Sequence, residues 1–103
     1  MISLCIQYPS KGGGRFDFEY YLSVHLPMAE RLLSEYGFRD SSVYRCTGTL
    51  GGETPEFLCI TILEFESLDG LREGMRNHGA ELSADFSQYT DITPVATVTE
   101  LAE

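Results

Sequence analysis

One histidine stands where it could carry chemistry. His25 lies on the apolar face of a predicted helix, two residues before Pro27. Because proline has no N–H, the carbonyl of Ser23 loses its helical partner, and we expect the helix to kink or restart near His25. An imidazole there can act as a general acid or base near neutral pH. It can equally be a core histidine that hydrogen-bonds to the Ser23 carbonyl or to a tyrosine.

Two carboxylates near the end of the second predicted helix are candidate partners for this imidazole. Asp85 and Asp91 lie on either side of Tyr89. A carboxylate beside an imidazole can orient the ring or take part in proton transfer. The chain holds 16 acidic residues, so each aspartate also has the simpler interpretation of a helix cap or a solvated charge.

The cysteines and aromatic residues point to a pocket only weakly. Cys5, Cys46 and Cys59 show no CxxC spacing, which argues against a zinc module and against a disulfide framework. Cys5 and Cys59 are predicted to share one face of the sheet and to line a cavity, although a buried, unreactive thiol is the simpler interpretation. Six tyrosines and six phenylalanines suit an apolar pocket for a small aromatic or alicyclic ligand, and aromatic residues also fill cores.

The hydrophobic pattern predicts two helices and four strands to position these residues. Asp17 and Ser67 can cap the two helices, of which the first ends at Gly37 and the second can continue through residues 80–86. Extended patterns predict strands over residues 2–8, 41–50, 57–65 and 95–101. The order β-α-β-β-α-β predicts a ferredoxin-like α+β fold, with a four-stranded antiparallel sheet and two helices on one face. We expect a single domain over residues 1–103.

The first helix is the most clearly amphipathic of these elements. At the period of an α-helix, its apolar residues gather on one side and its charged residues on the other. The face expected to be buried comprises Phe18, Leu22, His25, Ala29, Leu32 and Tyr36. His25 therefore faces either the sheet or a cleft beside it.

Both faces of the strand at 57–65 are apolar. Leu58, Ile60 and Ile62 point to one side, and the other side carries Phe57, Cys59, Leu63 and Phe65. Two helices cover only one side of a sheet, and the chain has no further element for the other side. A second copy packed sheet to sheet about a two-fold axis is the simplest cover, so the pattern predicts a homodimer.

Composition restricts the partners and the compartment. Seven basic residues against 16 acidic ones give a net charge of −9, which excludes a nucleic-acid binder and argues against an anionic membrane surface. From its pattern we expect no signal peptide and no membrane span, and its thiols fit a reducing cytoplasm. No haem, flavin or metal motif is present, so we expect no bound cofactor.

Several segments together resemble a known family. Phe16-Asp17 followed by Tyr20-Tyr21-x-x-x-His25-x-Pro27 resembles the first-helix motif of the EthD-like proteins of the dimeric α/β-barrel superfamily. Similar matches cover the turn and third strand and the C-terminal signature, at Gly51-Gly52 with Pro55, Phe57 and Phe65, and at Ala84-Asp85, Tyr89-Thr90-Asp91 and Pro94. The resemblance implies the ferredoxin-like fold, the dimer, and a cleft between helices and sheet. His25 would lie at its edge, with Asp85 and Tyr89 in the pocket.

The resemblance leaves the reaction open, because members of this superfamily isomerise lactones, cyclise or dehydrate polyketides, or oxygenate substrates without a bound cofactor. Our first hypothesis is a cofactor-independent enzyme that acts on a small carbonyl, lactone or polyketide-like compound. His25 would move a proton and Asp85 would set its tautomer. Tyr21 or Tyr89 would donate a hydrogen bond to the developing oxyanion, and Cys59 would be a further pocket residue.

Two alternatives remain. The chain could be a cofactor-free monooxygenase, or an accessory protein of a system that degrades ethers or aromatic compounds. It could also be a non-catalytic dimer that binds a small hydrophobic ligand.

Overall fold

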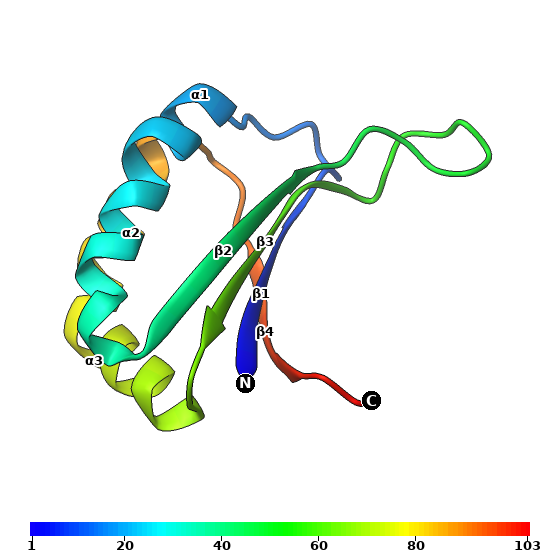
Figure 1. Cartoon of the computed structure of the whole chain (residues 1–103). Helices are drawn as coiled ribbons and strands as arrows, with labels where there is room; N and C mark the ends of the chain where they lie inside the picture. Colours follow the sequence, from blue (N-terminus) through cyan, green and yellow to red (C-terminus); the bar gives the residue numbers. More distant parts are fainter.

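The computed structural model describes residues 1–103 and shows a four-stranded antiparallel sheet with helices on one face (Figure 1). The strands are β1 (Ile2–Pro9), β2 (Phe38–Arg45), β3 (Phe57–Phe65) and β4 (Val95–Glu100), in the sheet order β2-β3-β1-β4. This is the predicted ferredoxin-like α+β fold. The second strand starts earlier than predicted because Phe38 pairs with Phe65, and it ends at Arg45, before a long hairpin loop.

The first helical segment runs without a break from residue 18 to residue 36. It consists of α1 (Phe18–Tyr20), a π turn η1 (Tyr21–His25), α2 (Leu26–Leu33) and a 3-10 turn η2 (Ser34–Tyr36). The side chain of Asp17 accepts a hydrogen bond from the Tyr20 N–H, as its capping role predicts. Gly37 ends the segment with φ of 83°, a conformation that glycine adopts without strain.

The π turn is the way in which this helix accommodates Pro27. The N–H of Leu26 donates to the Tyr21 carbonyl, five residues back, so the extra residue is absorbed just before the proline. Tyr21 and His25 therefore lie on the same face with their rings stacked, 5.6 Å apart between centroids. Leu22 was expected on the buried face, and this expectation is wrong: its side chain is 47% exposed, because the π turn rotates it away from the sheet.

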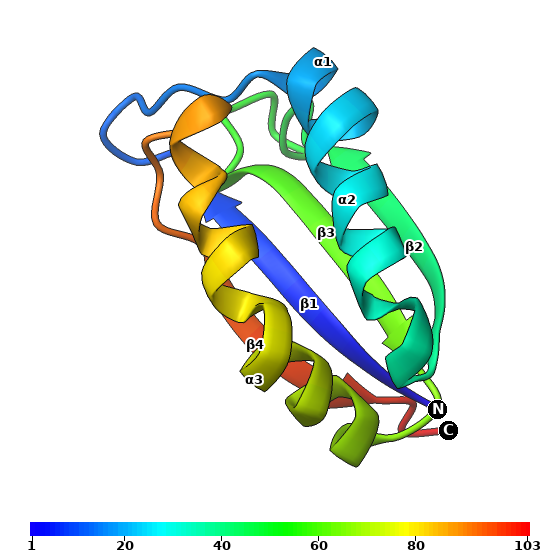
Figure 2. The same ribbon diagram turned by 90° about the vertical axis from the view of Figure 1, so that its left-hand side faces the viewer.

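The second long helix, α3 (Leu68–Ala84), lies beside α2 on the same face of the sheet (Figure 2). Ser67 caps it by accepting the Gly70 N–H at 3.1 Å. It continues through Gly79, as predicted, and is followed by the 3-10 turn η3 (Phe86–Gln88). No helix of the chain has both the length and the apolarity needed to cross a membrane.

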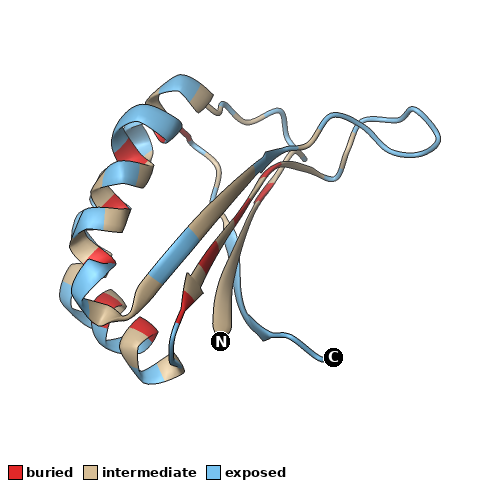
Figure 3. Cartoon of the chain, viewed as in Figure 1, coloured by how far each residue is buried: buried red, intermediate tan, exposed pale blue.

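The core lies between the helices and the sheet, where Figure 3 shows the buried residues. It has an aliphatic part, which includes Leu33, Leu63 and Phe65. Its aromatic part lies at the end of the sheet near α1 and consists of four fully buried residues, Tyr8, Tyr21, Cys59 and Tyr89. The candidate functional residues belong to this aromatic part or border it.

The opposite face of the sheet carries no helix. Ile60 and Ile62 of β3 lie on it and are half-buried in the single chain. Cys5 pairs with Ile62, whereas Cys59 pairs with Tyr8. The expectation that the two cysteines share a face is therefore wrong, since the register pairs odd-numbered residues of β1 with even-numbered residues of β3. Cys5 lies on the open face and Cys59 on the helix face.

Candidate active site

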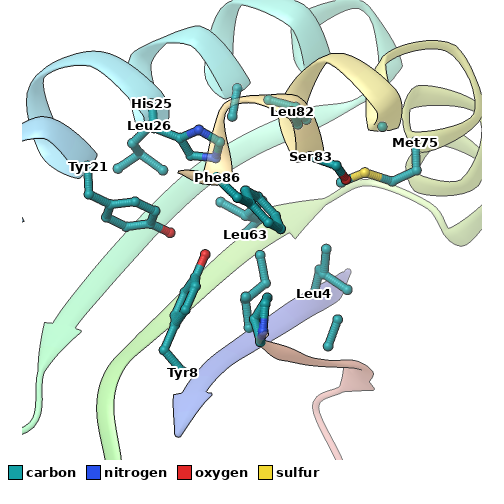
Figure 4. A pocket seen from close by; sticks show the side chains of 15 residues that line it. Leu4, Tyr8, Tyr21, His25, Leu26, Leu63, Met75, Leu82, Ser83 and Phe86 are labelled. Carbon is teal, nitrogen blue, oxygen red and sulfur yellow. The ribbon is translucent and has the colours of Figure 1, made fainter. Parts of the chain in front are cut away.

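A cavity of about 230 Å³ lies between the helices and the sheet (Figure 4). Eleven of its 15 lining residues are hydrophobic. They come from both helices and from three strands, so the cavity exists only in the folded chain. The apolar wall includes Leu4, Ile6, Leu26, Leu63, Leu82 and Phe86. Such a space suits an apolar ligand that is oriented by a few polar groups.

Three of these polar groups gather at the end of the cavity near η1. The imidazole of His25 and the phenols of Tyr8 and Tyr21 line it, and Figure 4 shows the two hydroxyl groups pointing toward one another across the space. All three side chains are buried, with His25 only 6% exposed. Polar groups held in a water-poor environment interact strongly with charge that develops on a bound ligand.

Asp85 does not line the cavity but holds the imidazole of His25. Its Oδ2 lies 3.0 Å from Nδ1 of the imidazole. Its Oδ1 accepts a hydrogen bond from the Tyr20 hydroxyl at 2.8 Å. This hydrogen bond raises the pKa of Tyr20, because the carboxylate stabilises the protonated phenol. The Ser23 carbonyl and the tyrosines, which were the alternative partners expected for His25, are not the groups that bind its Nδ1.

The contact with Asp85 determines what His25 offers to a ligand. A carboxylate accepts hydrogen bonds, so Nδ1 carries the proton of the neutral ring and Nε2 keeps a lone pair. Nε2 has no hydrogen-bond partner in the chain, yet no polar side-chain atom of the chain is buried without one. Nε2 is therefore not sealed from solvent, and His25 lines the cavity, so this nitrogen is the one free to act as a general base.

A second hydrogen-bonded group supports the phenols. The hydroxyl groups of Tyr8 and Tyr89 lie 3.0 Å apart, and the hydroxyl of Tyr21 lies 2.7 Å from Oγ1 of Thr61. Burial raises the pKa of Tyr8, Tyr21 and Tyr89. These phenols therefore stay protonated at neutral pH and can donate hydrogen bonds.

The remaining predicted pocket residues lie behind the cavity wall. Tyr89 does not line the cavity; its ring packs 4.7 Å from the His25 ring, measured between centroids. Cys59 does not line it either. The Cys59 thiol contacts Thr61 at 3.8 Å, and burial raises its pKa to about 11. Both residues support the side chains that do reach the cavity.

Asp91 has a different partner from Asp85. Its Oδ1 accepts the backbone N–H of Arg15 at 2.8 Å, and the neighbouring Thr90 hydroxyl donates to the Arg15 carbonyl at 2.6 Å. These bonds tie the loop before the first helical segment to the loop before β4. Of the two aspartates considered from the sequence, only Asp85 contacts His25.

Three site residues were missed from the sequence. Tyr8 continues the alternation of β1 toward the helix face, so strand period alone could have placed it beside the helices. Tyr20 precedes Tyr21 in the first helix, but its contact with Asp85 depends on the tertiary fold. Thr61 is the one hydroxyl residue in an apolar strand, and this contrast could have marked it as a residue with a polar partner.

No group of three His, Cys, Asp or Glu side chains is arranged to hold a metal ion.

Comparisons with known proteins support the ferredoxin-like fold of this chain. A scan against models of protein families finds no match, and neither does a search of curated proteins. Among solved structures, SnoaB, a cofactor-independent oxygenase from Streptomyces nogalater, superposes with a TM-score of 0.70 at 9% identity, over 99% of this chain and 93% of that one. At this identity the likeness concerns the fold alone.

Two other solved structures are EthD proteins. An EthD family protein from Bacillus halodurans C-125 is 22% identical with a TM-score of 0.76, over 98% of both chains. An EthD-like protein from Ralstonia eutropha JMP134 is 31% identical with a TM-score of 0.90, over 99% of this chain and 92% of that one. Fold, sequence and full-length coverage agree, and the chain belongs to the EthD-like family.

Proposed function

We propose that this protein is a cofactor-independent enzyme that moves a proton at a carbon next to the carbonyl group of a small, apolar compound. One observation carries the proposal: Nδ1 of His25 is held by Asp85 at 3.0 Å, so that Nε2 is left without a partner in a residue that lines an apolar cavity. A general base requires this arrangement, in which one ring nitrogen is held and the other is left for a ligand.

The proposed step uses two groups of the cavity wall. Nε2 of His25 takes the proton from the carbon, and the electron pair moves into the carbonyl to give an enolate. Asp85 balances the charge on the imidazolium. Tyr21 lines the cavity and turns its phenol proton from the neighbouring Tyr8 oxygen to the enolate oxygen, while Thr61 can donate its own proton to the Tyr21 oxygen at 2.7 Å. Where a carbon–carbon double bond is conjugated with the enolate, return of the proton to the far end of that system completes an isomerisation; in other substrates the proton returns to the same carbon, and the result is exchange.

The size of the cavity limits the substrate. A protein cavity of about 150 Å³ holds benzene. The cavity here has about 230 Å³, so it accommodates one ring with short substituents. We therefore propose single-ring ketones, lactones and related enolisable compounds as the substrate class.

Oxygenation of the same substrate is the second candidate. SnoaB, which shares the fold, is a cofactor-independent oxygenase, and another solved neighbour is described as an antibiotic biosynthesis monooxygenase. An enolate made by His25 could give its electrons to O₂ and form a hydroperoxide. Loss of water from that hydroperoxide leaves a new carbonyl. Both candidates share the proton transfer and differ in whether O₂ is consumed.

We also propose that the enzyme is a homodimer formed through the open face of the sheet. Ile60 and Ile62 lie on this face, and Tyr44 and Val95 on it are 56% and 51% exposed in the single chain. Removing such apolar surface from water favours association. A dimeric ferredoxin-like protein is among the solved neighbours with this fold.

Deuterium exchange tests the proton transfer without knowledge of the product. α-Angelica lactone and phenylacetone in D₂O are followed by ¹H NMR, and the wild-type protein is expected to speed the loss of the signal next to the carbonyl. His25→Gln should lower the rate about 10²–10⁴-fold, which is the usual contribution of a general base. His78→Gln, at the other histidine, which does not line the cavity, is the matched control.

The outcomes separate the candidates. Exchange that His25→Gln abolishes and His78→Gln preserves supports the proposal. Oxygen uptake with the same dependence on His25 selects the second candidate. Exchange at the buffer rate with wild-type protein, or an unchanged rate in His25→Gln, rejects proton transfer by His25.

A further inference from the structure

We infer that ligands enter the cavity between α3 and β4, and that Gly79 determines which of them can pass. The inference rests on the proposed function in one respect: the cavity is taken as the ligand site. It adds the route to that site and a residue that limits the shape of the ligand.

The exposure of the lining residues locates the opening. At the His25 end, Tyr8, Tyr21 and His25 are 1%, 2% and 6% exposed. At the other end, Ser83 of α3 and Ala96 of β4 are exposed. The cavity is therefore closed behind the proposed base and open between α3 and β4, and Figure 4 shows Ser83 and Met75 at a distance from Tyr21.

The position of β4 in the sheet explains the opening. It is an edge strand that pairs only with β1, and all six of its residues are exposed. Val98 pairs with Leu4 of the cavity wall, which places it on the helix side of the sheet. Its side chain is nevertheless 50% exposed. No element of the chain covers the gap between this strand and α3.

Gly79 stands on the α3 lip of this opening, and neither backbone nor packing requires a glycine there. Its φ is not positive, and a Cβ added to it would have no heavy atom within 4 Å. Gly70 and Gly74 of the same helix differ, because a Cβ at Gly70 would collide with the Tyr36 carbonyl and one at Gly74 would come within 2.9 Å of Leu33. A glycine inside a helix costs stability relative to alanine, so its presence at residue 79 calls for another reason.

The lining of the cavity supplies this reason. Met75, Gly79 and Ser83 are spaced four residues apart, so they lie on one face of α3, and all three line the cavity. A side chain at residue 79 would project into the opening between Met75 and Ser83. With glycine there, a ring whose reacting carbon lies at His25 can carry an extended substituent that leaves the cavity past residue 79.

Binding of p-cresol tests the inference separately from catalysis. The ligand is titrated into ¹⁵N-labelled protein and followed by NMR. Wild-type protein is expected to show saturable shifts at cavity residues such as His25 and Leu82. Gly79→Leu should weaken binding at least about tenfold, equivalent to about 1.4 kcal/mol, because its side chain would occupy the opening and part of the space that the ligand fills. Ala80→Leu places the same side chain at the next position, which is exposed and outside the cavity, and should bind as wild type does.

Gly79→Ala and Gly79→Cys are control variants that keep the test informative if Gly79→Leu does not fold. The alanine variant should bind p-cresol normally and melt several degrees higher, because its methyl group meets no neighbour and favours the helix. In the folded Gly79→Cys variant, iodoacetamide should modify residue 79 readily, and p-cresol should slow that modification several-fold.

The inference is overturned if Gly79→Leu binds p-cresol as wild type does, if wild-type protein shows no saturable shifts in the cavity, or if p-cresol leaves the labelling of Gly79→Cys unchanged. Since p-cresol does not need to react, these results are independent of the deuterium exchange. Loss of binding in Gly79→Leu without any exchange by wild-type protein would support the access route and reject the proposed function.

Discussion

Nδ1 of His25 lies 3.0 Å from Oδ2 of Asp85, although 60 residues separate them in the chain. His25 is the last residue of the π turn that precedes Pro27, and Asp85 directly follows the last residue of α3. The π turn and the end of α3 thus place these two side chains in contact. Because Asp85 binds Nδ1, Nε2 is the ring nitrogen left for a ligand, and the chemical role proposed for His25 depends on this.

The tautomer of His25 is the most direct test of this pair. In the neutral ring we expect the proton on Nδ1, since the Asp85 carboxylate can only accept. Long-range ¹H–¹⁵N NMR distinguishes the two ring nitrogens by their shifts. Asp85→Ala should remove the preference for Nδ1–H, and His78 in the same spectra serves as an internal reference. A neutral His25 with its proton on Nε2 in wild-type protein would contradict the assignment of Nε2 as the base.

The Tyr20 phenol should respond to the same carboxylate. Its hydrogen bond to Asp85 raises its pKa above the usual value of about 10. Asp85→Asn should therefore lower the pKa of Tyr20 toward that value, as followed by the ¹³C shift of its Cζ through an alkaline titration. Because the folded-state pKa is the higher one, this hydrogen bond stabilises the fold below about pH 10 and ceases to do so at higher pH.

Asp91→Asn is the control for this titration, because Asp91 binds the Arg15 backbone and not Tyr20. An equal Tyr20 midpoint in Asp85→Asn and Asp91→Asn would mean that the hydrogen bond at 2.8 Å does not persist in solution.

Sequence periodicity was sufficient for the fold, because strands and helices are specified by local patterns. The third strand was predicted at its observed bounds, residues 57–65, since both of its faces are apolar and loops border it. The π turn was outside the reach of a periodic pattern. The proline indicated a disturbance of the helix near His25. A kink and an inserted residue both accommodate the lost hydrogen bond to the Ser23 carbonyl, so the sequence did not distinguish them. Which of the two forms determines whether Tyr21 or Leu22 faces the sheet.

The candidate site was predicted in part. Asp85 and Asp91 were both considered as partners of His25 from the sequence, the family resemblance favoured Asp85, and the structure brings Asp85 into contact with His25. Cys59 and Tyr89 were expected to be pocket residues, but neither lines the cavity. For Cys59 the reason is that strand parity predicts which face of the sheet a residue lies on and does not predict whether it reaches the cavity. Tyr20 belongs to the same motif as His25, but no role was assigned to it, because its contact with Asp85 depends on how α1 meets the end of α3.

Cys59 should be unreactive while the chain is folded. Burial raises its pKa to about 11, so at pH 8 only about one thiol in a thousand is the nucleophilic thiolate. We expect iodoacetamide at pH 8 to leave Cys59 unmodified in native protein and to modify it in denaturant, as shown by mass spectrometry of its peptide. Rapid modification in the native state would reveal an activated thiol and would make Cys59 a candidate nucleophile.

A charge on the open face of the sheet should prevent the proposed dimer. Ile60 lies on that face between Tyr44 of β2 and Gln7 of β1, so a second sheet packed there would bury it. Ile60→Asp would place an unpaired carboxylate in that interface, where loss of its water is costly. We expect wild-type protein to sediment with twice the mass of the 11.5 kDa chain and Ile60→Asp to sediment as a monomer.

Leu22→Asp is the matched control, since it adds the same charge in place of an exposed leucine on the helical side of the molecule. It should remain dimeric, and circular dichroism should show that both variants keep their helices. A wild-type monomer at every concentration, or a dimer that survives Ile60→Asp, would show that the open face is not the interface. The half-buried isoleucines of β3 would then need another cover, because an apolar sheet face of this kind is unstable against water.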